Sequence, residues 1–132
     1  MHPKFQIFIS STYLDLKEER RHAAKAIIEL GHFTAGMELF VANNGMLLET
    51  IYKWIEDSDL IIFIQGVRYG TIGTENEYSY TETEFRYAQN LKKPIFLILL
   101  HREEINRRLS DPETIKWIEG DNREKYEAFS SF

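Results

Sequence analysis

The 132-residue chain contains no cysteine. Disulfide bonds, thiol nucleophiles and cysteine-ligated zinc sites are therefore excluded, and the composition agrees with a reducing compartment, so we expect a cytoplasmic protein. No apolar run approaches the roughly 20 residues that span a bilayer, and the first residues lack the apolar core of a signal peptide. Positive charge is not in excess either, because the formal net charge is -5. These absences argue against a membrane protein and against a protein built mainly to bind nucleic acid.

Familiar phosphate and metal motifs are also missing. The chain has no Gly-x-x-x-x-Gly-Lys-Ser/Thr loop and no Gly-x-Gly-x-x-Gly after a strand, so neither a P-loop nor the usual dinucleotide fingerprint is present. The four histidines show no metal-ligand spacing. We therefore expect no metal site and no resident cofactor.

What the chain does contain is an alternation of apolar runs and helical patterns. Unbroken apolar runs indicate strands buried on both faces, and apolar residues at helical spacing indicate helices between them. We predict strands at 5–10, 32–40, 60–65 and 94–100, helices at 14–30, 47–57, 80–91, 103–109 and 122–129, and turns at 43–45 and 111–112. This order predicts an α/β fold, a flavodoxin-like doubly wound parallel sheet of four to five strands in a three-layer α/β/α arrangement. The length suits one domain over 1–132, and the lack of a clear fifth strand suggests that the natural protein continues past Phe132.

The loops after the first and third predicted strands point to a binding site. Ligands of parallel sheets bind beyond the carboxyl ends of the strands, and in a flavodoxin-like order these two loops open a crevice. Hydroxyls and free amides there can hold phosphate or ribose, and the N-terminus of the following helix favours an anion. Arg68 can pair with a phosphate, and Tyr69 can stack on a base. The candidate binding residues on these loops are Ser10, Ser11, Thr12, Gly66, Arg68 and Tyr69.

A local interpretation of the same loops stays open. Serine and threonine before a helix usually cap it, and Thr12-x-x-Asp15 fits that role. Gly66 and Gly70 fit tight turns. Against this, the polar segment 66–79 is long for a loop in a compact domain, and loops of that length are often functional.

Glu84 is the candidate catalytic residue. On the third predicted helix it shares a face with Ala88 and Leu91, and this face should look toward the sheet. A glutamate is rarely buried without a partner, and partial burial raises the pKa of a carboxyl group. Such a group is a candidate acid, base or charge stabiliser.

Helix capping is the alternative role for the glutamates of this segment. Both Thr81-x-x-Glu84 and Ser79-x-x-Glu82 match a capping box. If Ser79 is the true cap, Glu82 closes the box and Glu84 is free to point into the crevice. Ser79, Tyr80 and Thr81 then lie at the rim as further candidate binding residues.

Arg20 stands in the apolar stripe of the first predicted helix, where an apolar residue is expected. A buried guanidinium needs a carboxylate partner, because an unpaired buried charge costs several kcal/mol. Glu84, Glu38 and Asp15 are the possible partners. Equally, the stem can pack while the head reaches water.

Four segments in order resemble one family. They are Phe-Ile-Ser-Ser-Thr-Tyr-Leu-Asp-Leu-Lys-Glu-Glu-Arg at 8–20, Gly-Met-Glu-Leu-Phe at 36–40, Ser-Asp-Leu-Ile-Ile-Phe-Ile-Gln-Gly-Val-Arg-Tyr-Gly at 58–70 and Ser-Tyr-Thr-Glu-x-Glu at 79–84. Together they resemble the TIR-like domain family of unknown function found at the N-termini of bacterial STAND-type ATPases. The resemblance covers nearly the whole chain to about Leu100. It implies a flavodoxin-like sheet like that of TIR domains and nucleoside 2-deoxyribosyltransferases.

The same resemblance bears on Glu84. The segment 81–88, followed by Lys93-Pro94, is similar to the transferase segment Thr-Ala-Phe-Glu-Leu-Gly-Tyr-Ala with Gly-Lys-Pro, and the match falls on Glu84. In those enzymes this glutamate acts at the sugar C1′, and in catalytic TIR domains a comparably placed glutamate supports glycosidic cleavage of NAD. Here 78–80 reads Tyr-Ser-Tyr where the transferases have Asp-x-Gly, which argues against a free nucleoside as substrate.

The resemblance implies a TIR-like signalling or effector domain, part of a longer defence protein, that binds a nucleotide and cleaves the N-glycosidic bond of NAD with Glu84. NAD would be its substrate, not its cofactor. The rival is a non-enzymatic module for self-association or for assembly with other domains, in which Glu84 serves only in a cap or in an ion pair with Arg20. A third interpretation is a nucleoside deoxyribosyltransferase-like enzyme. An open pocket beside Glu84 favours an enzyme, and a carboxylate satisfied by its own helix start favours the module.

Overall fold

The computed structural model describes residues 3–36, 48–72 and 77–131. Within them the chain alternates strands and helices and ends in three short helices. The elements are β1 (Gln6–Ser10), α1 (Lys17–Glu29), β2 (Phe33–Ala35), α2 (Leu48–Asp57), β3 (Leu60–Gln65), α3 (Tyr80–Asn90), β4 (Ile95–Leu99), α4 (Arg102–Leu109), α5 (Pro112–Ile118) and α6 (Arg123–Phe129). The described part of the chain has no helix that is both long and apolar enough to cross a membrane.

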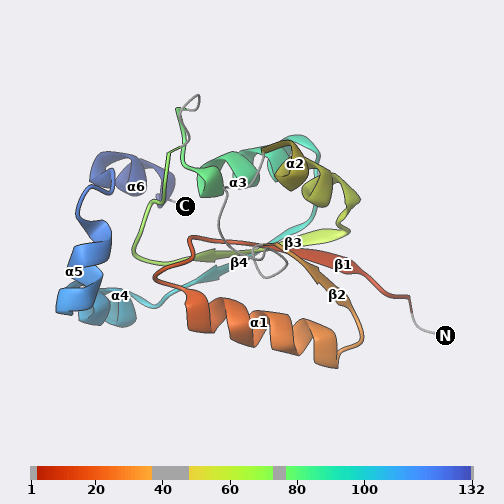
Figure 1. The fold of residues 1–132 in the computed structure, drawn as a ribbon, viewed down its shortest axis with the longest axis horizontal. Helices are drawn as coiled ribbons and strands as arrows, with labels where there is room; N and C mark the ends of the chain where they lie inside the picture. Colours follow the sequence, from red (N-terminus) through yellow and green to blue (C-terminus); the bar gives the residue numbers. More distant parts are fainter. Residues whose placement is uncertain (1–2, 37–47, 73–76, 132) are drawn as a thin grey trace.

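The four strands form one parallel sheet in the order β2-β1-β3-β4. Helix α1 covers one face, and α2 and α3 cover the other (Figure 1). The predicted α/β doubly wound, three-layer architecture is therefore confirmed. Because the chain crosses from β2 over β1 to β3, the loops after β1 and β3 leave the sheet toward opposite faces at its carboxyl edge.

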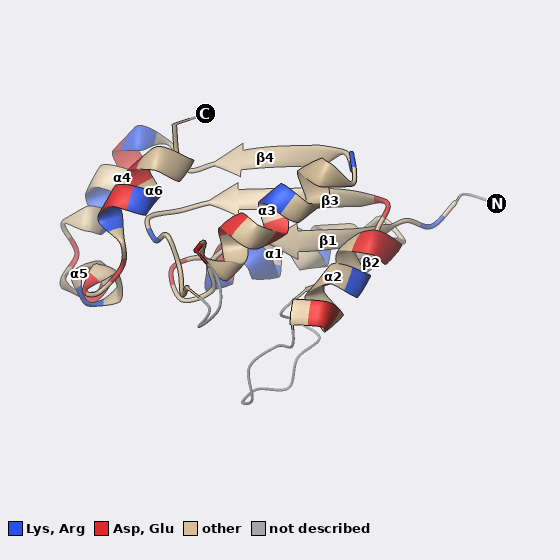
Figure 2. Cartoon of the chain, turned by 90° about the horizontal axis from the view of Figure 1, so that it is seen from above, with Lys and Arg blue, Asp and Glu red and all other residues tan. Residues whose placement is uncertain are grey.

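Alternation along β1 divides the core between the two faces. Ile7 and Ile9 pack with residues of α1, whereas Phe8 packs with residues of α2 and α3. Strands β1, β3 and β4 carry no charged residue, and the charges gather on the helices (Figure 2). In β1 and β3 the apolar runs thus mark strands that helices cover on both faces, as expected for the central strands of a parallel sheet.

Several boundaries differ from the predicted ones. Helix α1 begins at Lys17 rather than at 14, because residues 13–16 form a turn in which the Leu16 amide donates to the Tyr13 carbonyl. The predicted turn at 111–112 is wrong: Asp111 caps α5, its side chain accepting from the Glu113 amide, and Pro112 fills the first helical position. The predicted strand 32–40 lies only partly within the described residues, and the turn 43–45 lies outside them.

Strand β4 is an edge strand with both faces half exposed. Its side chains from Phe96 to Leu99 are each between 44% and 59% exposed. Its partner on one side is β3, and no strand of the described residues pairs with its other side. An apolar edge of this kind is a surface that another chain segment can pair with.

Candidate functional site

Asp15 joins the two loops that the sequence places at the crevice. Its buried Oδ2 accepts hydrogen bonds from the backbone amides of Val67 (3.0 Å) and Arg68 (3.2 Å), and its Oδ1 accepts one from the Thr12 hydroxyl (2.5 Å). The Thr12-x-x-Asp15 cap predicted for the first helix is therefore wrong. The N-cap residue of α1 is Leu16, whose apolar side chain can make no cap hydrogen bond. Thr12 and Asp15 instead bond to each other, and Asp15 binds the loop after β3.

Asp121 holds the next two amides of the same loop. It lies between α5 and α6, and its side chain is 2% exposed. Its Oδ2 accepts from the Tyr69 amide (2.8 Å) and its Oδ1 from the Gly70 amide (3.0 Å). Four consecutive amides, 67–70, are thus bound by two protein carboxylates, so the expectation of free amides for a phosphate is wrong for the loop after β3. Sequence reasoning missed Asp121, and no local pattern marks it.

The two glycines of this loop have different reasons to be glycine. A Cβ on Gly66 would lie 2.6 Å from Oδ2 of Asp15, so glycine is required by the close approach of the carboxylate rather than by a tight turn. Gly70 has φ of +102°, a conformation that favours glycine, and it fits the predicted turn role.

The structure contains the predicted crevice as a cavity of about 290 Å³ between the loops after β1 and β3 and the start of α3. Five of the candidate binding residues lie in its wall. The lining residues are Ser11, Thr12, Tyr13, Leu14, Ile51, Arg68, Gly70, Thr71, Tyr80 and Thr81. Hydroxyls, one guanidinium and aromatic rings therefore meet over a partly apolar floor.

Glu84 is buried next to this cavity. The Ser10 hydroxyl donates to its Oε1 at 2.7 Å, so its carboxylate is tied to β1. Glu84 is not among the lining residues, but its neighbours are: Ser11 follows Ser10, and Thr81 lies one turn earlier on α3. The carboxylate thus lies beside the cavity wall, within the sheet–helix interface.

Arg20 is also buried, at 2% exposure, so the alternative in which its head reaches water is wrong. Its Nη1 donates to the Ser11 hydroxyl (2.9 Å) and its Nη2 to the Ile9 carbonyl (3.1 Å). Glu38, one of its predicted partners, lies outside the described residues. Arg20 and Glu84 therefore hold consecutive residues, Ser11 and Ser10, at the carboxyl end of β1.

Ser79 is the true cap of α3, because its hydroxyl accepts from the Glu82 amide at 3.1 Å. In a complete capping box the Glu82 side chain would accept a hydrogen bond from the Ser79 amide. Here the Tyr69 hydroxyl accepts that bond instead. The Tyr69 hydroxyl accepts from the Ser79 amide (3.0 Å) and donates to Glu82 Oε1 (2.7 Å), while Arg86 Nε donates to Glu82 Oε2 (2.7 Å). Burial, and then the bond to Glu82, raise the pKa of Tyr69 to about 12.

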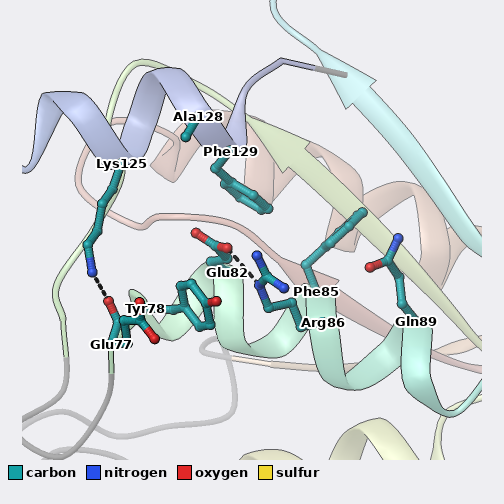
Figure 3. A pocket seen from close by; sticks show the side chains of 9 residues that line it. All are labelled: Glu77, Tyr78, Glu82, Phe85, Arg86, Gln89, Lys125, Ala128 and Phe129. Atoms are coloured by element: carbon teal, nitrogen blue, oxygen red, sulfur yellow. Dashed lines mark hydrogen bonds and ion pairs between the residues drawn. The ribbon is translucent and has the colours of Figure 1, made fainter.

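This network removes Tyr69 from the cavity. The ring is 1% exposed, so it is not available to stack on a base, contrary to the expectation. Tyr80 lines the cavity in its place. The Glu82–Arg86 pair faces a second hollow of about 380 Å³ between α3 and α6, beneath Phe129 (Figure 3). Across residues 3–36, 48–72 and 77–131, no group of three or more acidic, histidine or cysteine side chains is arranged to hold a metal ion.

Comparison with known proteins places the chain in a family. A model of the family described as a domain of unknown function, DUF4062, matches residues 6–131, and the chain belongs to that family. No curated protein matched. Among solved structures, the chain is similar to the TIR domains in the activated Roq1 resistosome, which directly recognizes the pathogen effector XopQ. The TM-score is 0.58 at 14% identity, over 89% of this chain and 72% of that one. The fold is therefore TIR-like.

Proposed function

We propose that this domain binds a nucleotide in the 290 Å³ cavity and that Glu84 supports cleavage of the N-glycosidic bond of NAD. The observation that carries the proposal is the juxtaposition of two features: a cavity lined by hydroxyls and Arg68, and a buried carboxylate fixed by Ser10 beside its wall.

The binding part of the proposal rests on side chains. Because Asp15 and Asp121 occupy the amides at 67–70, we assign the phosphate to the guanidinium of Arg68. The Nε of Arg68 donates to the Trp117 carbonyl (3.3 Å), which holds the guanidinium at the cavity edge. Hydroxyls of Ser11, Thr12 and Thr81 suit a ribose, and the Tyr80 ring suits stacking on a base.

The chemical part rests on Glu84. Breaking the bond between nicotinamide and ribose develops oxocarbenium character at C1′, and a nearby carboxylate stabilises this charge or forms a transient ester. Water then adds to C1′, which releases ADP-ribose and frees the carboxylate. Nicotinamide leaves as a neutral base, so the step needs no metal. Because Glu84 does not line the cavity, the proposal requires the wall at Ser11 and Thr81 to rearrange when ribose binds.

The biological setting follows from the sequence resemblance. It supports a signalling or effector domain at the N-terminus of a bacterial STAND-type ATPase with a role in defence. The TIR-like fold is compatible with this setting, although fold alone does not assign function.

The test is nicotinamide release from NAD by concentrated protein, measured by chromatography. The Glu84→Gln variant should lose turnover, whereas the control Glu49→Gln, at an exposed position on α2, should keep it. Arg68→Gln should weaken binding of ADP-ribose, measured by calorimetry. Turnover that survives Glu84→Gln would refute the assignment, and cleavage of free nucleosides instead of NAD would favour the transferase-like interpretation.

A second candidate function, an assembly module, is favoured by the exposed apolar edge of β4. Self-association can bury Phe96 to Leu99 by strand pairing. Light scattering over a range of concentrations tests this, with Leu97→Lys compared with Leu30→Lys, an exposed position at the end of α1. Association abolished only by Leu97→Lys, without any NAD turnover, would establish the module.

A further inference from the structure

The last helices of the chain contact the backbone of the loop after β3. Helices α5 and α6 lie at the end of the sheet where the strands point (Figure 1). Asp121, at their junction, accepts from the amides of Tyr69 and Gly70 at 2.8 and 3.0 Å. The Tyr126 hydroxyl donates to the Gly66 carbonyl at 2.7 Å.

Arg123 completes this contact. Its Nη1 donates both to Asp121 Oδ2 (2.8 Å) and to the Val67 carbonyl (2.7 Å). The charges of Arg123 and Asp121 therefore neutralise each other. Asp121 accepts from two amides of the loop, and Arg123 donates to one of its carbonyls. Hydrogen bonds to charged groups are about twice as strong as neutral ones. A segment more than 50 residues away in sequence thus fixes the loop from Gly66 to Gly70.

The loop held in this way forms part of the cavity wall. Arg68 and Gly70 line the cavity, and each is bound through its own amide, Arg68 by Asp15 and Gly70 by Asp121. Asp15, on the loop after β1, binds the amides of Val67 and Arg68. Asp121, on the segment between α5 and α6, binds the amides of Tyr69 and Gly70. Its side chain is 2% exposed, so water does not compete for these two amides.

We infer that Asp121 is a positioning residue for the nucleotide cavity, through which the C-terminal helices set the geometry of the loop that carries Arg68. This inference rests on the proposed nucleotide binding for its functional consequence. Its structural part, the immobilisation of 67–70 by Asp121, stands independently.

The experiment compares Asp121→Asn with the native protein by hydrogen exchange and by ADP-ribose binding. Asparagine keeps the shape but removes the charge and one acceptor, so one amide is left facing an NH₂ group. Loss of one charge-assisted hydrogen bond corresponds to about a tenfold change in an equilibrium. We therefore expect exchange of the Tyr69 and Gly70 amides to rise about tenfold or more and ADP-ribose affinity to fall about tenfold.

Asp111→Asn is the matched control, because Asp111 caps α5 in the same segment without contacting the loop. Exchange in β3 reports global stability. It should stay unchanged in Asp111→Asn, and in Asp121→Asn it should rise less than exchange at Tyr69 and Gly70, which lose their direct partner. If Asp121→Asn does not fold, Arg123→Gln tests the same contact by removing the donor to Val67 and the counter-ion of Asp121.

The outcomes separate the two proposals. Unchanged exchange at Tyr69 and Gly70 overturns the inference, as does raised exchange with native ADP-ribose affinity. Failure of the native protein to bind ADP-ribose would refute nucleotide binding. In that case a larger rise of exchange at 67–70 than in β3 in Asp121→Asn still supports immobilisation of the loop by Asp121. An equal rise of exchange in β3 and in the loop overturns it.

Discussion

Replacing Gly66 by alanine should test whether the contact between the loops after β1 and β3 holds the candidate site together. The added Cβ would lie 2.6 Å from Oδ2 of Asp15 and 2.9 Å from Cδ2 of Leu16, distances that real Cβ atoms do not tolerate. The Asp15 carboxylate must therefore move away from the amides of Val67 and Arg68 that it now binds.

The size of the effect follows from these two hydrogen bonds. Bonds to a charged group contribute roughly 1.5–3 kcal/mol each, and a buried carboxylate cannot regain them from water. Partial relaxation of the Leu16 side chain offsets some of the loss. We expect Gly66→Ala to lower the free energy of unfolding by about 2–4 kcal/mol, measured by urea denaturation.

Gly31→Ala is the matched control. Gly31 has φ of +87°, but a Cβ there meets nothing within 4 Å, so the cost is backbone strain alone, about 1 kcal/mol. In the double variant with Asp15→Asn, the Gly66→Ala cost should shrink, because the clash and the lost bonds share one carboxylate. A Gly66→Ala protein as stable as Gly31→Ala, or full additivity with Asp15→Asn, would contradict the reasoning.

Three further predictions concern groups buried around the site. The pKa of Tyr69 in the folded protein, about 12, lies above the ordinary value of 10.0, so the neutral ring stabilises the fold fully below pH 10. This part of the free energy of unfolding, about 2–3 kcal/mol, is lost between pH 10 and 12. Tyrosinate absorbance should show this ring ionising at higher pH than an ordinary tyrosine, and at lower pH in Glu82→Gln than in the native protein. Arg20→Met leaves the Ile9 carbonyl without this donor, so unfolding in urea should become easier by about 3 kcal/mol, and an unchanged midpoint would show that the buried guanidinium contributes nothing. Ser79→Ala removes the α3 cap and should cost about 1 kcal/mol in thermal unfolding followed by circular dichroism, whereas the same change at exposed Ser110 should cost less.

Much of the fold was predictable from local pattern. The apolar runs at 60–65 and 94–100 are both strands, as predicted. The first is covered on both faces, as such a run indicates, whereas the side chains of the second stay half exposed at the edge of the sheet. Ser79 was one of two predicted caps, and the structure selects it because the helix begins at Tyr80. The crevice between the loops after β1 and β3 followed from the order of a doubly wound sheet.

Polar residues that pair over long distances in the sequence were not predictable in the same way. Tyr69 was expected to stack on a ligand because it lies on the loop after β3. Its hydroxyl instead binds the Ser79 amide and Glu82 at the start of α3. Thr12 and Asp15 match a cap by spacing, yet Asp15 binds amides 52 residues away. A local pattern cannot distinguish a carboxylate that caps its own helix from one that binds a distant loop, because both satisfy the same kind of backbone donor.

The sequence by itself therefore determined the strands, their parallel arrangement and every helix of the described residues except α5, since these depend on the spacing of apolar residues along the chain. Only the tertiary structure decided which polar groups meet at the rim. Asp15 and Asp121 reach the same loop from opposite directions along the chain, and Ser10 reaches Glu84 across 74 residues. Such pairs form because folding buries these groups together and each must then find a hydrogen-bond partner, a requirement that acts in space and leaves no periodic trace in the sequence.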